Sequence, residues 1–310
     1  MVKAKKQTKD FITLKSINVN AGLKAWYVKE LVKLVTFMLK GYESKLISLY
    51  KSNKDQIKDI AMDDNVGSEA KTVLNKLNKA YSKYYDKKSK EASETMVQKT
   101  EKLLKTTLEA SFYSVVSKLA DKDTQENRVI KELFSQFSPE VLSNKEKFMK
   151  AFTVNKRLYY QVNNELKKTI MMNNAELIKS IQQEYHKNVS QQVYECIVNG
   201  KSETELADML QVVGSKTKRR ARLIAKDQVN KAHSVLYRQE LKQNGINKAK
   251  WIHIGGGKTD RKTHVTNAPK GLNNAIFDIK KGIYDPSVQK YIQPAELPFC
   301  RCSLIPIVEV

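Results

Sequence analysis

The chain has 310 residues, of which 41% are hydrophobic and 29% charged, so it can form one large or two ordinary domains, and wholesale disorder is excluded. Lys and Arg number 56 against 33 Asp and Glu, and the net charge of +23 favours nucleic acid or another anionic surface as a partner. Three cysteines are too few for a disulfide framework and fit a reducing compartment. We expect no signal peptide after Met1 and no membrane span, because the most apolar window, 31–39, is too short.

Helices dominate the expected N-terminal region. Residues 1–15 look like a flexible basic arm, and apolar residues at three-to-four spacing then predict long amphipathic helices. The expected ranges are 23–52 (weakened near Gly41), 68–90, 92–119, 125–137, 139–150 and 155–198, the last stopped by Asn199-Gly200. The predicted fold class is a mainly α N-terminal region with long helices followed by a small α+β C-terminal domain, divided as 1–200 and 201–310.

A basic helix follows this region. Ser202 is expected to cap a short helix ending at Gly214, and a second helix runs from Ser215 to about Gln243, closed by Gly245. A helix–turn–helix is an alternative interpretation of this pair. The start of the second helix carries candidate DNA-binding cations: Lys216, Lys218, Arg219, Arg220, Arg222 and Lys226.

These cations belong to a strongly basic segment, because residues 215–270 hold fifteen Lys or Arg and three acids. Six cations near a helix N-terminus would oppose the helix dipole unless an anion relieves them. The pattern therefore predicts contact with a phosphate backbone rather than base-specific reading, and a merely solvated face is the alternative.

Short strands are expected after residue 248. Residues 250–254 and 275–279 read as strands, 281–299 as a proline-bearing loop, and 303–308 as a final edge strand. The Gly255-Gly256-Gly257 turn lacks the glycine spacing of a P-loop, which excludes that motif.

Cysteine and histidine side chains could form a metal site in this C-terminal part. Cys300, Cys302 and His264 offer three ligands to a structural zinc, and Asp260 or His253 could supply the fourth. The alternative is a pair of buried thiols, with Arg301 paired to Asp260 or Asp278. Hydrolytic zinc is disfavoured because no acid is placed as a general base, and no catalytic residue is assigned.

These features occur in a recognisable order. The helix Arg220–Ala232 leads to Gly245-Ile246, Trp251, the Asp260-to-His264 segment, Gly271, a proline-bearing loop and Cys300-Arg301-Cys302. From about Ser202 to Pro306 the chain resembles the phage head morphogenesis family, the minor head proteins with a domain like protein F of phage Mu. Many members carry His-Pro just before Cys-x-Cys, where this chain has Leu297-Pro298-Phe299, so one potential ligand is missing.

The resemblance implies a minor capsid protein, not an enzyme, inside the virion near the portal and in the host cytoplasm during assembly. Implied partners are the portal protein, capsid or scaffolding protein, and double-stranded DNA bound without sequence preference. One alternative is a nuclease or toxin-like phosphodiesterase using His253, Asp260, Arg261 and His264. Another is a structural connector whose basic surface contacts only acidic capsid or portal surfaces.

Overall fold

The computed structural model describes residues 11–13, 16–53, 64–120, 163–255 and 260–309. Contacts divide the chain into two compact units. The helical unit contains Ala21–Gln98 and Asn164–Val229, and the sheet unit contains Met1–Asn20, Lys99–Asn163 and Asn230–Val310. The predicted fold class is confirmed: long helices precede a C-terminal region of small antiparallel sheets. The predicted domain boundary at residue 200 stays a prediction.

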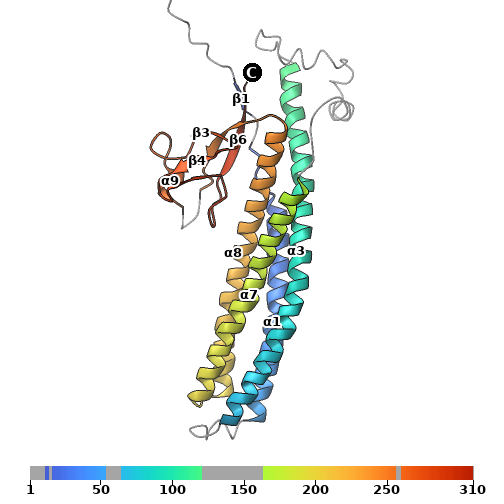
Figure 1. The fold of residues 1–310 in the computed structure, drawn as a ribbon, viewed down its shortest axis with the longest axis vertical. Helices are drawn as coiled ribbons and strands as arrows, with labels where there is room; N and C mark the ends of the chain where they lie inside the picture. The colour runs from blue at the N-terminus through green and yellow to red at the C-terminus, as the bar shows by residue number, and fades with distance from the viewer. Residues whose placement is uncertain (1–10, 14–15, 54–63, 121–162, 256–259, 310) are drawn as a thin grey trace, which may run out of the picture. The chain divides into compact units, whose positions relative to one another are not determined.

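Four long helices supply the described elements of the helical unit (Figure 1). They are α1 (Ala21–Ser52), the first part of α3 (Asp64–Ala120), α7 (Asn164–Val198) and the first part of α8 (Glu203–Gln243). None of the described helices is both long enough and apolar enough to cross a membrane.

Tyrosines form much of the buried stripe of α1. Buried residues recur at three-to-four spacing along the helix, as burial of one helix face requires: Leu23, Tyr27, Leu31, Val35, Met38, Tyr42, Leu46 and Tyr50. The Tyr42 ring meets Tyr185 of α7 edge to face at 5.2 Å, and the Tyr50 hydroxyl donates to the Val193 carbonyl of α7. The predicted amphipathic helix is therefore present, with aromatic rings supplying its contacts to α7.

Two predicted helix interruptions, near residue 91 and at Gly214, are wrong, and the helix expected over 23–52 is continuous. Helix α1 continues through Gly41, α3 continues through the expected break near residue 91, and α8 continues through Gly214. At Gly214 the missing side chain lets α8 approach Leu39 of α1, so this glycine serves close packing rather than a turn. Because α8 is one helix, the helix–turn–helix interpretation is excluded.

The predicted helix-capping signals are confirmed. The Ser202 hydroxyl accepts the Glu205 N–H, and the Glu205 carboxylate accepts the Ser202 N–H, so the two residues form a capping box at the start of α8. Gly200 and Gly245, both with positive φ, follow the C-terminal ends of α7 and α8. Their backbone N–H groups bond back to carbonyls of the last turn, as helix-ending glycines do.

The sheet unit contains an antiparallel sheet of order β1-β6-β2-β3. Its strands are β1 (Phe11–Thr13), β2 (Lys248–Ile252), β3 (Ile276–Asp278) and β6 (Ser303–Glu309). A separate hairpin pairs β4 (Ile283–Asp285) with β5 (Lys290–Ile292), and α9 (Lys262–Val265) is a single turn of helix. The two strands expected around 250–254 and 275–279 are confirmed.

Two expectations for this unit are corrected. The final strand is not an edge strand, because β1 from the supposed flexible arm pairs with it. Among the described residues the pairing with β1 reaches Ile307, and Pro306 lies opposite Ala249 of β2. The loop expected over 281–299 contains the β4–β5 hairpin.

Some predictions lie outside the described residues. They concern residues 1–10, the helices at 125–137 and 139–150, and the start of the 155–198 helix.

Candidate functional site

Two cysteines and a histidine gather on the sheet unit. Cys300 and Cys302 lie just before β6, and because successive side chains of an extended segment alternate in direction, the Cys-x-Cys spacing directs both thiols to one side. His264 comes from α9. Its Nδ1 lies 3.6 Å from the Sγ atom of Cys300 and 3.6 Å from that of Cys302. The three buried ligand atoms all lie within 4.8 Å of one another, so the predicted ligands are brought together.

Asp285 fixes the orientation of the His264 ring. The Nε2 atom of His264 lies 3.0 Å from Asp285 Oδ2, while the Ser287 backbone N–H and hydroxyl donate to Oδ1 of the same carboxylate. Burial raises the pKa of Asp285, but the Ser287 and His264 hydrogen bonds outweigh it, so the net shift is downward. Sequence reasoning missed Asp285, and the Asp-Pro-Ser turn at its position was the only local signal.

The two thiols share their protons unequally. The hydrogen bond from Cys302 lowers the pKa of Cys300 below its usual value, against the opposing effect of burial and with help from His264. A thiolate at Cys300, together with burial, raises the pKa of Cys302. Burial lowers the pKa of His264, but contacts with Cys300 and Asp285 reverse this and raise it. The cluster therefore favours one thiolate, the form in which cysteine binds metal.

His253, at the end of β2, adjoins this cluster. Its Nδ1 lies 3.6 Å from Cys302 Sγ, and its Nε2 lies 3.4 Å from Asp260 Oδ2. The other Asp260 oxygen lies 3.3 Å from Arg301, so the predicted Arg301–Asp260 pair is present. Asp260 thus contacts a histidine and an arginine, and neither Asp260 nor His253 belongs to the group of three clustered ligand atoms.

The candidate DNA-binding cations occupy the middle of α8 rather than a helix N-terminus. Helix α8 begins at Glu203, with Glu203 and Glu205 in its first turn. The helix dipole acts within about one turn of the helix end, so it does not oppose these cations, contrary to the prediction. The remaining observation in favour of phosphate contact is the solvent exposure of some of these side chains. Arg219, Arg222 and Lys226 are exposed at three- and four-residue spacing, which places them on one face.

Arg220 has a different role from its neighbours. Its Nε lies 3.1 Å from Glu184 Oε2, and its Nη2 donates to the Ser180 hydroxyl, both on α7. In contrast, the structure gives no ion pair to Arg219, Arg222 or Lys226 within the part of the chain that it describes. The predicted set of cations therefore divides into Arg220, which ties α8 to α7, and an exposed group.

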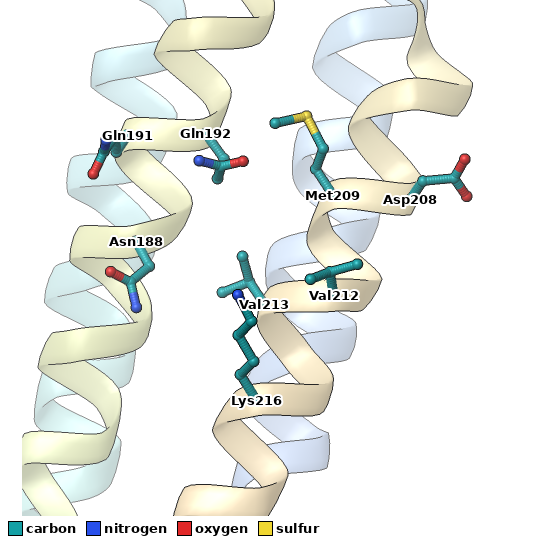
Figure 2. A pocket seen from close by; sticks show the side chains of 8 residues that line it. All are labelled: Asn188, Gln191, Gln192, Asp208, Met209, Val212, Val213 and Lys216. Atoms are coloured by element: carbon teal, nitrogen blue, oxygen red, sulfur yellow. The ribbon is translucent and has the colours of Figure 1, made fainter.

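Lys216 lines a groove between α7 and α8 with a volume of about 410 Å³ (Figure 2). Asn188, Gln191 and Gln192 of α7 form one wall, and the α8 wall is Asp208, Met209, Val212, Val213 and Lys216. Figure 2 shows the amide side chains on one helix and Met209 and Val213 on the other. Amides, one acid and one lysine can hydrogen-bond a polar ligand, but this groove holds no cluster of catalytic groups.

One protein family matches the C-terminal part of the chain. Residues 187–305 match the family described as Phage Mu protein F like protein. The match confirms, over this segment, the resemblance to the phage head morphogenesis family, and the family implies a role in phage head morphogenesis. The exposed α8 cations, both histidines and both cysteines of the cluster lie within the matched residues.

A curated relative adds little about function. An uncharacterized protein of Haemophilus influenzae is 29% identical over 136 residues, which are 44% of this chain and 28% of that protein. The chain thus spans less than a third of the length of the relative that it matches. No solved structure matches the chain.

Proposed function

We propose that this protein is a minor capsid protein of a tailed bacteriophage that lies inside the head near the portal and binds double-stranded DNA without sequence preference. In this role it assists head assembly and DNA delivery, with portal and capsid or scaffolding proteins as partners, and it passes through the host cytoplasm during assembly. The family match over residues 187–305 and the net charge of +23 support the proposal. The observation that carries the DNA-binding part is the exposed cationic stripe of α8, Arg219, Arg222 and Lys226.

Phosphate contacts explain why such a stripe would bind DNA of any sequence. At about 1.5 Å per residue the stripe extends for about 10 Å along α8, and its cations have no carboxylate to neutralise them in the described part of the chain. Lys and Arg side chains contacting phosphates release condensed counterions, which provides affinity without reading bases. Lys218, half-buried, and Lys216, at the edge of the groove, flank the stripe.

Substitution of the stripe tests the proposal. We expect Arg219→Ala, Arg222→Ala and Lys226→Ala together to weaken binding to two duplexes of unrelated sequence by the same factor, at least tenfold near physiological salt. Lys71→Ala, Lys76→Ala and Lys83→Ala together are the matched control, because these exposed lysines of α3 remove the same charge. Equal loss in both variants, or none in either, would remove the stripe from the DNA-binding surface.

The nuclease alternative gains no support from the site. His264, its intended acid or base, exposes only 2% of its side chain, and its Nε2 is bonded to the fully buried Asp285. Incubation of the protein with labelled DNA and RNA, with and without metal, tests this alternative: cleavage that disappears in His264→Ala would favour it. Sedimentation with portal protein but never with DNA would favour the structural connector.

A further inference from the structure

We propose that His253, His264, Cys300 and Cys302 bind one Zn²⁺ in a closed, four-ligand structural site, and that Asp260 and Asp285 orient the two histidines rather than bind the metal. This inference does not depend on DNA binding. It assigns His253 as the fourth ligand, where the residue pattern left the choice between His253 and Asp260 open.

Three of the distances between ligand atoms match those of a tetrahedral zinc site. Zinc–sulfur bonds of about 2.3 Å and zinc–nitrogen bonds of about 2.0–2.1 Å, at the tetrahedral angle, place S and N about 3.6 Å apart. Three such pairs lie at 3.6 Å in the structure: His264 with Cys300, His264 with Cys302, and His253 with Cys302. Three edges of one tetrahedron thus have the required length. His253 touches only Cys302 and lies outside the group of three atoms that are all within 4.8 Å of one another, so zinc binding would have to draw its ring toward Cys300 and His264.

Both histidines present the same nitrogen to the thiols. In His264 and His253, Nδ1 faces sulfur while Nε2 faces a carboxylate, Asp285 at 3.0 Å and Asp260 at 3.4 Å. A carboxylate that accepts the Nε2 proton leaves Nδ1 unprotonated, and this is the usual arrangement behind a metal-binding histidine. A shared metal ion would explain why two histidines from separate parts of the chain have the same ring orientation.

Strand register explains how the ligands converge. Strands β2 and β6 are antiparallel, and their pairing reaches Ile252 opposite Ser303. One step further along the same register, His253 stands opposite Cys302. The site therefore lies at the end of the β2–β6 pair, and His264 links α9 to it.

The chemistry of the ligands selects the metal and its role. Two sulfur and two imidazole ligands in a tetrahedron suit Zn²⁺, whereas Mg²⁺ and Ca²⁺ require oxygen ligands. Four protein ligands leave no open position for a substrate or a reactive water, so the ion would be structural. Three of the four strands of the main sheet have only three to five residues, and a metal link at its end would add to the stability of these short pairings.

Metal analysis of the full-length chain tests the proposal. We expect one zinc per chain after exhaustive dialysis, and Co²⁺ replacement should give the visible absorption and sulfur-to-cobalt charge transfer of a tetrahedral dithiolate site. The double variant Cys300→Ser/Cys302→Ser should lose both signals, while Cys196→Ser, which changes the buried thiol of α7, should keep them. A cobalt spectrum without thiolate bands, or zinc retained by the double variant, would overturn the site.

Three further variants examine the roles of the two histidines and their carboxylate partners. Asp285→Asn should weaken zinc affinity about 10–100-fold without changing the stoichiometry, because Asp285 orients a ligand but does not bind the ion. His253→Ala should weaken zinc binding and change the cobalt spectrum, whereas Asp260→Ala should leave the number of cobalt ligands unchanged. A spectrum altered by Asp260→Ala but not by His253→Ala would contradict our assignment of the fourth ligand. DNA affinity of these variants is a separate readout, so each proposal can fail alone.

Discussion

Individual polar residues fix contacts inside the helical unit that hydrophobic periodicity does not show. Asn174 of α7 is fully buried, and its side-chain amide donates to the Tyr27 hydroxyl of α1 and the Ser93 hydroxyl of α3. Burial raises the pKa of Tyr27, so its hydroxyl stays protonated. One asparagine thus joins three helices through the hydrogen bonds of its side-chain N–H groups, while its side-chain oxygen is buried without a hydrogen-bond partner in the described part of the chain.

Removal of this amide should destabilise the protein. We expect Asn174→Ala to lower the free energy of unfolding by about 1–3 kcal/mol, because it leaves buried hydroxyl groups short of a partner. Asn188→Ala, an exposed change on the same helix, should cost less than about 0.5 kcal/mol. Urea unfolding followed by circular dichroism measures both, and equal stability of the two variants would show that the network contributes little.

At this scale, residue type predicted only part of the candidate site. The two cysteines and His264 could be selected because thiols and imidazoles are metal ligands, and they do meet in space. Asp285 and the direction of Arg220 could not be predicted. Asp285 reaches His264 only through the β4–β5 hairpin, and Arg220 faces Glu184 only because α7 lies beside α8. Such contacts depend on tertiary packing, which one sequence does not reveal.

At the scale of elements, glycine was the misleading signal. Gly41 and Gly214 suggested a weakened and a broken helix, but both lie inside continuous helices where another side chain comes close. A β-carbon on Gly41 would overlap the hydroxyl of Tyr81 of α3, whose ring packs against Tyr42. Tertiary contact thus overrides the low helix propensity of glycine.

Alanine substitution separates these two effects. We expect Gly41→Ala to lower the midpoint of thermal unfolding, because displacing Tyr81 costs about 1–3 kcal/mol and exceeds the gain in helix propensity of about 1 kcal/mol. Gly67→Ala in α3, where a β-carbon would meet no atom within 4 Å, should raise the midpoint instead. In the double variant Gly41→Ala/Tyr81→Ala, the loss of stability should be smaller than the sum of the losses in the two single variants. A midpoint raised by Gly41→Ala would contradict the packing argument.

Strands were harder to predict than helices. The alternating segment around Trp251 was recognised, but β1, β4 and β5 have only three residues each, too few for a periodic signal. The interior position of β6 was missed because its neighbour β1 comes from the other end of the chain. Pairing over so large a separation in sequence leaves no local pattern.

At the scale of the whole molecule, positive charge is the dominant property. The chain carries a net charge of +23. However, the first turn of α8 is acidic, and Arg220 is paired with Glu184. The number of cations in a segment therefore overstates the positive charge that is available to a ligand. The family match covers the part of the chain that contains both the α8 stripe and the Cys/His cluster. Our two proposals, contact of the stripe with DNA and stabilisation of the sheet unit by the cluster, therefore both concern the matched segment.

The salt dependence of DNA binding tests the central claim most directly. For the full-length chain, the logarithm of the association constant should fall linearly with the logarithm of salt concentration. In the Arg219→Ala/Arg222→Ala/Lys226→Ala variant the slope should be shallower by about 2–3, close to 0.9 for each lost phosphate contact. The Lys71→Ala/Lys76→Ala/Lys83→Ala control should keep the original slope. A slope unchanged by loss of the α8 cations would contradict the claim that they contact the DNA backbone.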